Sequence, residues 1–439
     1  MTDVQTHADP AAPAPEDSPE TAIVHACDPE SVSAAPLEAR DSARTSRLIG
    51  IDVARGLALM GMMVIHILPA ADARGNITTA WSLAAGTSAA LFAVVAGVGI
   101  ALSTGRREHL VGRRWVAAAA SLVVRALLIG TLGLLLGRVV SGESAAVILP
   151  YYALLFIGAI PLLRVPARWL AVLTLVLAFA TPALSHLWRE TTVLPETYNP
   201  TFDNLLSEPG SVLASLLLTG EYPAMAWITY ICAGLAIGRC NLFSRGVVGA
   251  LLMLGIGLAV AARGASWLLL EHAGGREALE AAAPGSMTST ELSDVLVFGA
   301  DGVLPTTSPW WLAVSAPHTT TPFDLLFTIG VACAVLCTMI LLGRAIGYVL
   351  WPIAAAGSMT LTLYTAHLLL LDVSFMPDSA TAMYAVHLVG LLLFAMLWRR
   401  DFARGPLEEV VRALSGSTGR WVAKHAPAVR QRSRSADAS

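Results

Sequence analysis

Charged residues are scarce in this chain of 439 residues: they make up 13% of it, whereas about a quarter of a soluble protein is charged. Hydrophobic residues make up 55%, and the mean hydropathy is +0.65. Such a shortage of charge, together with many long apolar runs, is not typical of a soluble enzyme. It predicts a polytopic integral membrane protein.

Nucleotide-binding glycine motifs and paired cysteines are also lacking. The sequence has no P-loop and no GxGxxG fingerprint before a helix, so no motif predicts a nucleotide site. The cysteines, apart from Cys27, lie in or beside apolar runs, where a thiol packs as a small hydrophobe. Cys333 and Cys337 are four residues apart on one face of a predicted helix, and we assign no metal site to them. We expect neither a metal nor a nucleic acid as a ligand.

The two ends of the chain lack the apolar residues that a folded core needs. Residues 1–47 contain runs such as ADPAAPAPEDSPE, which predict a disordered, acidic tail rich in Pro and Ala. They also lack the apolar stretch of a cleaved signal peptide. Residues 415–439 predict a basic tail. Residues 48–414, between the two tails, are therefore predicted to form the membrane domain.

Long apolar runs occupy the middle of the chain. A helix needs about 20 apolar residues to cross the hydrocarbon layer. Runs of this kind predict an all-α bundle of about ten transmembrane helices, at residues 49–68, 80–103, 115–137, 146–163, 168–186, 222–239, 246–270, 322–343, 347–371 and 380–398. A further apolar piece, Ser211–Thr219, is too short to cross alone. It predicts a re-entrant or interfacial segment, which would be an eleventh membrane segment.

Positive charge is unevenly distributed among the predicted loops. Lys and Arg side chains stay on the cytoplasmic side of a membrane. With the amino terminus inside, most of the 28 lysines and arginines lie on the inner side, including those of both tails. Both termini are therefore predicted to be cytoplasmic, and the long loops at about 187–221 and 271–321 to be extracytoplasmic.

The first predicted span, IDVARGLALMGMMVIHILP, contains Asp52 and Arg55 near its inner end and His66 near its outer end. Arg55 and His66 are eleven residues apart, which puts them on nearly the same helix face, roughly 16 Å apart along the axis. An arginine at mid-membrane depth costs roughly 2.5–3.5 kcal/mol, so it should face protein or a water-filled cavity. In the alternative, Asp52 and Arg55 pair near the interface and His66 lies among headgroups.

This pattern of Asp, then Arg-Gly, then an apolar helix ending in His or Asn resembles two groups of membrane acyltransferases. One is the heparan-alpha-glucosaminide N-acetyltransferase family, with its bacterial relatives in domain-of-unknown-function family 418. The other is the broad acyltransferase-3 family, in which a His eleven residues after the Arg is held to be essential for transfer. The resemblance implies that His66 is essential in this chain.

Later segments resemble motifs of the same acetyltransferase group. They are GEYPAMAWITYICAGLAIGR at Gly220–Arg239, GSMTLTLYTAHLLLL at Gly357–Leu371, ARGPLEEVVR at Ala403–Arg412 and SAPHTTTPFD at Ser315–Asp324. One feature departs from the pattern. The animal-type members have Asn at the position of His66 and a catalytic His in the following outer loop, but here that loop, PAADARGNITTAW, has no histidine. The resemblance therefore assigns the base to His66 itself.

Histidine can accept a proton or hold an acyl group near neutral pH. Under the predicted topology, His66 and His367 both lie near the outer ends of their spans. Thr360, Tyr364 and His367 share one helix face, because they are spaced at i, i+4 and i+7. If this face meets the first span, two imidazoles and a phenol converge, and we predict His66, His367 and Tyr364 as catalytic residues. In the alternative, the Thr and Tyr hydroxyls bond to backbone or to a neighbouring helix.

Acyl-CoA is made in the cytoplasm, so a donor would enter from the inner side, where arginines can bind its phosphates. The predicted donor-binding residues are Arg55, Arg125, Asp52 and Arg113. Arg113 belongs to a loop with Arg106, Arg107 and Arg114, and the ordinary positive-inside bias also explains that cluster. On the outer side, the charged residues that could meet a polar acceptor, each expected to be a solvated loop charge, are His318, Asp324, Asp203 and Glu221.

The predicted function is that of an integral membrane acyltransferase in the plasma membrane. It would move an acyl group, expected to be acetyl, from cytoplasmic acyl-CoA to an extracytoplasmic sugar or amino sugar of the cell envelope. Its expected partners are the lipid bilayer, that acceptor and, in a homo-oligomer, a second copy. The rival is a transporter or permease whose buried Arg and His sites bind or relay substrate and protons, although the sequence shows no convincing internal repeat. A third possibility is a catalytically inactive family member.

Overall fold

A computed structural model describes residues 48–105, 110–191, 198–285, 287–300, 302–371, 373 and 377–425. Within these ranges the chain is helical, and its β-structure is limited to one isolated bridge between Ala71 and Ile77. The all-α fold class is therefore confirmed. The predicted tail at 1–47, the last residues of the predicted basic tail and the arginines Arg106 and Arg107 lie outside the described residues.

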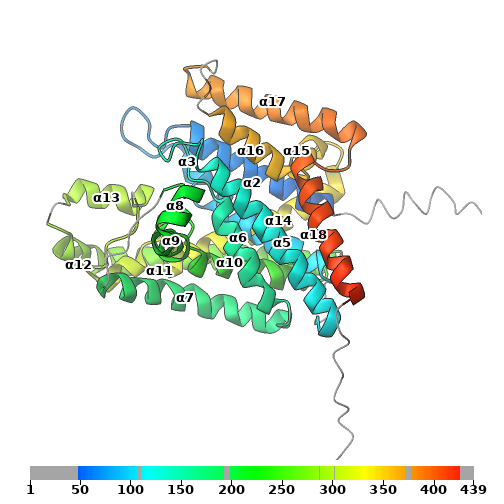
Figure 1. The fold of residues 1–439 in the computed structure, drawn as a ribbon. Helices are drawn as coiled ribbons and strands as arrows, with labels where there is room; N and C mark the ends of the chain where they lie inside the picture. The colour runs from blue at the N-terminus through cyan, green and yellow to red at the C-terminus, as the bar shows by residue number, and fades with distance from the viewer. Residues whose placement is uncertain are drawn as a thin grey trace, which may run out of the picture. The chain divides into compact units, whose positions relative to one another are not determined.

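Seven described helices are long and apolar enough to cross a membrane (Figure 1). They are α2 (Ile49–Ile67), the α3–α4 pair (Thr79–Ala84 and Thr87–Ser103), α5 (Gly112–Leu136), α7 (Ala167–Thr191), α11 (Arg245–Glu271), α14 (Pro322–Ile346) and α17 (Ala380–Asp401). Two other predicted spans form shorter helices, α6 (Leu149–Leu162) and α10 (Ala224–Arg239). Their apolar runs extend into adjoining loop residues, so hydropathy overestimates the helix length.

The predicted span at 347–371 is broken into α15 (Trp351–Gly357) and α16 (Thr360–Leu370), which are bent by 83° relative to each other. The described helices therefore provide seven candidate spans, or eight if the bent pair counts as one. The predicted re-entrant piece corresponds to a short apolar segment formed by α9 (Pro209–Ala214) and the π-helical turn η1 (Ser215–Thr219), which follow α8 (Phe202–Ser207).

The core of the bundle lies where α4 packs between α2, α10 and α14, while α11 packs on α14. Glycines allow α4 and α10 to approach closely. A Cβ atom added at Gly97 would press on the backbone of α10 at Ile231 and Gly234, and one added at Gly234 would overlap the carbonyl oxygen of Val94. Small residues at helix contacts are typical of membrane bundles, in which packing rather than hydrophobic exclusion holds the helices together.

Helices also occupy much of the predicted outer loop at 271–321. They are α12 (Gly275–Ala282), α13 (Ser289–Phe298) and the 3₁₀ turn η2 (Pro309–Ala313), which share a small apolar core that includes Leu279 and Trp311. A capping box between Thr288 and Glu291 begins α13. The side chain of Thr321, just before Pro322, begins α14 in a similar way by accepting from the next turn.

The break between α15 and α16 lies against the polar end of α2, because a Cβ atom at Gly357 would overlap the carbonyl oxygen of Asp52. The first turn of α16 is capped from another helix. Oε1 of Glu408 accepts from the backbone N–H groups of Leu361 and Thr362, at 2.6 and 3.2 Å, and Oε2 accepts from the Thr362 hydroxyl at 2.6 Å. Glu408 therefore supplies acceptors that the start of a helix otherwise lacks.

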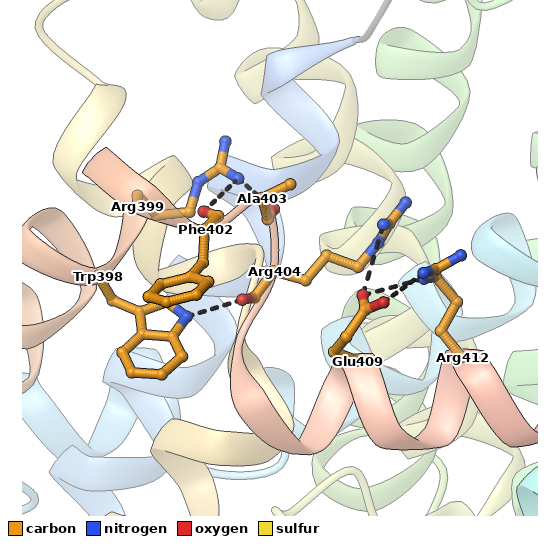
Figure 2. A network of polar contacts seen from close by, with 7 residues as sticks. All are labelled: Trp398, Arg399, Phe402, Ala403, Arg404, Glu409 and Arg412. Carbon is orange, nitrogen blue, oxygen red and sulfur yellow. Dashed lines mark hydrogen bonds and ion pairs between the residues drawn. The ribbon is translucent and has the colours of Figure 1, made fainter.

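Glu408 belongs to α18 (Pro406–His425), which packs along α5. Figure 2 shows the contacts at the turn between α17 and α18, made by Trp398, Arg399, Phe402, Ala403, Arg404, Glu409 and Arg412. The indole N–H of Trp398 donates to the carbonyl of Arg404 at 2.8 Å, and Glu409 forms ion pairs with Arg404 and Arg412. Helix α18 continues through residue 415, where the basic tail was predicted to begin.

Candidate active site

Three histidines from three helices form a continuous chain of ring contacts. Nδ1 of His66 on α2 lies 3.0 Å from Nε2 of His367 on α16, and Nδ1 of His367 lies 3.0 Å from Nδ1 of His387 on α17. The rings of His66 and His367 are nearly parallel, with an angle of 7° between them, while the ring of His387 stands at 88° to that of His367. His367 and His387 are buried, whereas His66 is partly exposed. His66 is therefore the least buried end of the chain.

Two members of this chain, His66 and His367, are residues that the sequence predicts, and the structure brings them together. The sequence analysis missed His387. Its segment, MYAVHLVGLLL, has one histidine within an apolar run. An ionisable side chain inside a membrane helix is costly unless it faces a partner, and that signal could have identified it.

Tyr364 lies on α16 with His367, but its hydroxyl contacts backbone. The hydroxyl accepts from the N–H of Ile148 at 3.2 Å and lies 3.4 Å from the carbonyl oxygen of Ala146, to which it donates. These contacts join α16 to the start of α6. They agree with the alternative interpretation, in which the Thr and Tyr hydroxyls of this helix face bond to backbone or to a neighbouring helix. The catalytic role of Tyr364 stays a prediction.

A second polar pair joins two distant loops. Nδ1 of His318 lies 2.9 Å from Oε1 of Glu221, and the backbone N–H of Gly86 donates to Nε2 of His318 at 3.2 Å when that imidazole is neutral. Burial disfavours the charged form of both side chains. The partner's charge, their mutual hydrogen bond and a further charge nearby together outweigh this effect, so the pKa of His318 is raised and the pKa of Glu221 is lowered. The expectation that these two are separate solvated charges is wrong, because they form a partly buried ion pair.

The other two outer carboxylates have different surroundings. Asp203 is exposed and pairs with Arg138 at 3.0 Å, as expected for a loop charge. Asp324 is buried and accepts from the backbone N–H of Thr320 at 2.9 Å. It therefore shapes the loop that positions His318 and is not a solvated charge, which corrects the expectation for this residue.

Glu221 and His318 line an open pocket. Its other polar lining residues include Tyr151, Arg189, Tyr198, Asn199, Ser215 and Thr319. Glu221 and His318 also act electrostatically on His66. His66, His367 and His387 are not among the lining residues of this pocket.

The predicted donor-binding residues do not form a single cluster. Asp52 and Arg55 form an ion pair, with Oδ1 and Nη1 3.3 Å apart. Arg125 is exposed, its guanidinium lies 4.8 Å from the ring centroid of Phe156, and it interacts electrostatically with Arg55. Arg113 donates instead to a backbone carbonyl near the end of α18, at 2.6 Å. Arg55 and Arg125 therefore remain as the pair that could meet an anion together.

No group of three or more His, Cys, Asp or Glu side chains among the described residues is arranged to hold a metal ion. In the histidine chain the ring nitrogens contact one another directly at 3.0 Å, which is the distance of a hydrogen bond. The chemistry that these residues offer is proton transfer or attack by an imidazole.

Two family models match the chain. The model described as heparan-alpha-glucosaminide N-acetyltransferase, catalytic, matches residues 47–249, and a model described as protein of unknown function (DUF418) matches residues 292–417. No curated protein matches the chain. The first match contains His66 and Glu221, and the second contains His318, His367 and His387. These matches confirm the family resemblance predicted from the motifs, whereas the relation to the acyltransferase-3 family stays a prediction.

Proposed function

We propose that this chain moves an acetyl group from cytoplasmic acetyl-CoA to an extracytoplasmic sugar or amino sugar of the cell envelope. It matches the heparan-alpha-glucosaminide N-acetyltransferase and DUF418 family models over different segments. The observation that supports this proposal most is the histidine chain. Its least buried end, His66, lies on the helix at the start of the segment that the acetyltransferase model matches. The membrane in question would be the plasma membrane.

His66 is the general base of this reaction. It takes a proton from the acceptor amine or hydroxyl as that nitrogen or oxygen forms a bond to the acetyl carbonyl carbon. The carbon–sulfur bond of the thioester then breaks, and the electron pair leaves on sulfur. The proton on His66 passes to that thiolate. The products are the acetylated acceptor and CoA with a free thiol, and His66 is neutral again.

The acceptor occupies the pocket lined by Glu221 and His318. A sugar is rich in hydroxyl groups, and the pocket offers hydroxyl, amide and guanidinium groups that can pair with them. The Glu221 carboxylate suits an amine, and its ion pair with His318 holds it in place. Because both residues act electrostatically on His66, an acceptor bound here lies near the base.

The donor phosphates bind from the inner side to Arg55 and Arg125. These two guanidinium groups repel each other, and a phosphate between them would relieve that repulsion. Asp52 would compete with the phosphate for Arg55. Arg113 is roughly 18 Å from Arg125 along α5 and already bonds to α18, so its contribution would be to the far end of the donor. This arrangement requires the Arg55 end of α2 to be on the cytoplasmic side, and we propose about ten crossings with both termini cytoplasmic.

The proposal is tested by acetyl-CoA turnover of the purified protein in lipid nanodiscs, with labelled acetyl groups and glucosamine as the acceptor probe. His66→Ala should abolish transfer while leaving the elution profile and thermal stability close to wild type. His272→Ala is the matched control, because His272 is an exposed histidine at the end of α11 and does not line the pocket. Full activity of His66→Ala would remove the assignment of the base.

One observation favours a second function. The bent pair of α15 and α16 is a discontinuous helix, and such helices form the substrate sites of many transporters. Here the bend has the capping carboxylate of Glu408 at the start of α16 rather than an open helix end. Uptake of a sugar into proteoliposomes without any acetyl-CoA, by protein that does not consume acetyl-CoA, would establish the transporter instead.

A further inference from the structure

We infer that His387 is a positioning residue that sets the tautomer of His66 through His367 and thereby leaves Nε2 of His66 without a proton, as a general base requires. The inference rests on the proposed acetyl transfer, and it assigns a role to a residue that does not touch the substrate. It follows from the three rings and from their surroundings.

The order of the contacts restricts where the protons can lie. A neutral imidazole has one N–H, so His367 can donate to one neighbour only and must accept from the other. If Nδ1 of His367 donates to His387, then Nε2 of His367 accepts from Nδ1 of His66. The single proton of His66 is then on Nδ1, and its Nε2 is a free base. If the direction is reversed, Nε2 of His66 carries the proton and cannot act as a base.

The tautomer of His387 therefore decides the state of His66, and a base at Nε2 of His66 requires one of the two. Its Nδ1 faces His367, and among the described residues its Nε2 has no hydrogen-bond partner within normal distance. For Nδ1 of His387 to accept from His367, the single proton of a neutral His387 must lie on Nε2.

His387 lines a groove between α16 and α17 whose other lining residues are mostly apolar: Thr362, Ala366, Leu370, Val386, Gly390, Leu391 and Phe394. With Nε2 protonated, Nδ1 of His387 accepts from His367, and the chain runs in the direction that frees Nε2 of His66. A proton leaving the acceptor would enter the chain at that nitrogen.

Substitutions at His387 separate this role from simple packing. His387→Asn retains an oxygen near the position of Nδ1 that can accept from His367, whereas His387→Leu removes the acceptor. We expect kcat for acetyl transfer to fall about 10–100-fold in His387→Leu, the range usual for a group that orients a functional histidine, with KM little changed. His387→Asn should recover most of that loss. Tyr384→Phe is the control, because it removes a polar group from the same helix without touching the chain.

The tautomer is read directly by ¹⁵N chemical shifts of selectively labelled histidine in nanodiscs, with His66 assigned by comparison with His66→Ala. The expected spectrum has an unprotonated Nε2 on His66 in the wild type and a mixture of tautomers in His387→Leu. A protonated Nε2 on His66 in the wild type, or an unchanged kcat in His387→Leu, would overturn the inference. Absence of turnover in the wild type would sink the proposed function instead, and the shifts would still report whether His387 sets the tautomer.

Discussion

Two adjacent glutamates at the start of α18, Glu408 and Glu409, are expected to contribute very differently to stability. Glu408 accepts three hydrogen bonds from the first turn of α16, whereas Glu409 pairs with Arg404 and Arg412 on the surface (Figure 2). The two residues have the same charge, the same size and nearly the same position in the sequence. Substituting each by alanine therefore compares how much a cap on another helix and an exposed ion-pair network contribute to stability.

The magnitude for Glu408→Ala follows from the groups that lose their acceptor. The N–H groups of Leu361 and Thr362 would both be left without a partner, and an unpaired buried N–H costs about 1–3 kcal/mol. The site is only half buried, so water replaces part of what is lost. We expect a loss of about 2 kcal/mol, the upper end of the effect of removing a helix cap. Exposed ion pairs add little, so Glu409→Ala should leave stability close to wild type.

The assay is thermal unfolding of each variant in the same detergent, followed by tryptophan fluorescence, together with acetyl-CoA turnover per folded molecule. Because α16 also holds His367, Glu408→Ala should lower turnover as well as the melting temperature. Glu408→Gln retains an oxygen for the two backbone N–H groups and should lie between wild type and Glu408→Ala. Equal melting temperatures for Glu408→Ala and Glu409→Ala would refute the capping argument.

Three further predictions concern packing, pH and the tyrosine. Gly357→Ala should destabilise the fold by about 1–3 kcal/mol or more and so reduce the yield of monodisperse protein, because its Cβ would overlap the Asp52 carbonyl. Gly249→Ala on α11 has open space around it and should not reduce the yield. Equal yields of the two variants would contradict the close packing at Gly357. The raised pKa of His318 stabilises the fold below the ordinary histidine value of about 6.5 and loses that effect as the pH rises through the raised value, while the lowered pKa of Glu221 stabilises it above about 4.3. Wild type should therefore melt at a higher temperature than His318→Gln, and this difference should be greatest between about pH 4.3 and 6.5 and disappear at alkaline pH. A difference that does not depend on pH would exclude the ion pair. Tyr364→Phe should cost about 1–3 kcal/mol in thermal unfolding by leaving the Ile148 N–H unpaired, yet turnover per folded molecule should fall far less than the 10²–10⁴-fold typical of a lost acid or base.

Local patterns in the sequence were enough to predict the helical class and part of the site. Low charge and long apolar runs required a membrane bundle, and helical periodicity put Arg55 and His66 on one face of the first span. The same periodicity put His367 on a face with Tyr364. Each of these inferences depends on spacing within a single helix, which the chain determines locally.

What could not be predicted depends on contacts between distant helices. The break after Gly357 contains no proline, and its position reflects the close approach of α15 to α2 and the cap from Glu408. The ion pair of Glu221 with His318 joins two loops whose approach no local signal indicates. His387 has no motif around it, and its importance becomes visible only when its ring is found against His367.

The most direct test of the account measures acetyl transfer across a sealed bilayer. Proteoliposomes of uniform orientation would receive labelled acetyl-CoA on the face that contains the amino terminus and glucosamine, as the acceptor probe, on the opposite face. The account predicts that wild type and His272→Ala acetylate the acceptor across the bilayer and that His66→Ala does not. Acetylation that occurs only when donor and acceptor share a face, or that persists in His66→Ala, would contradict it.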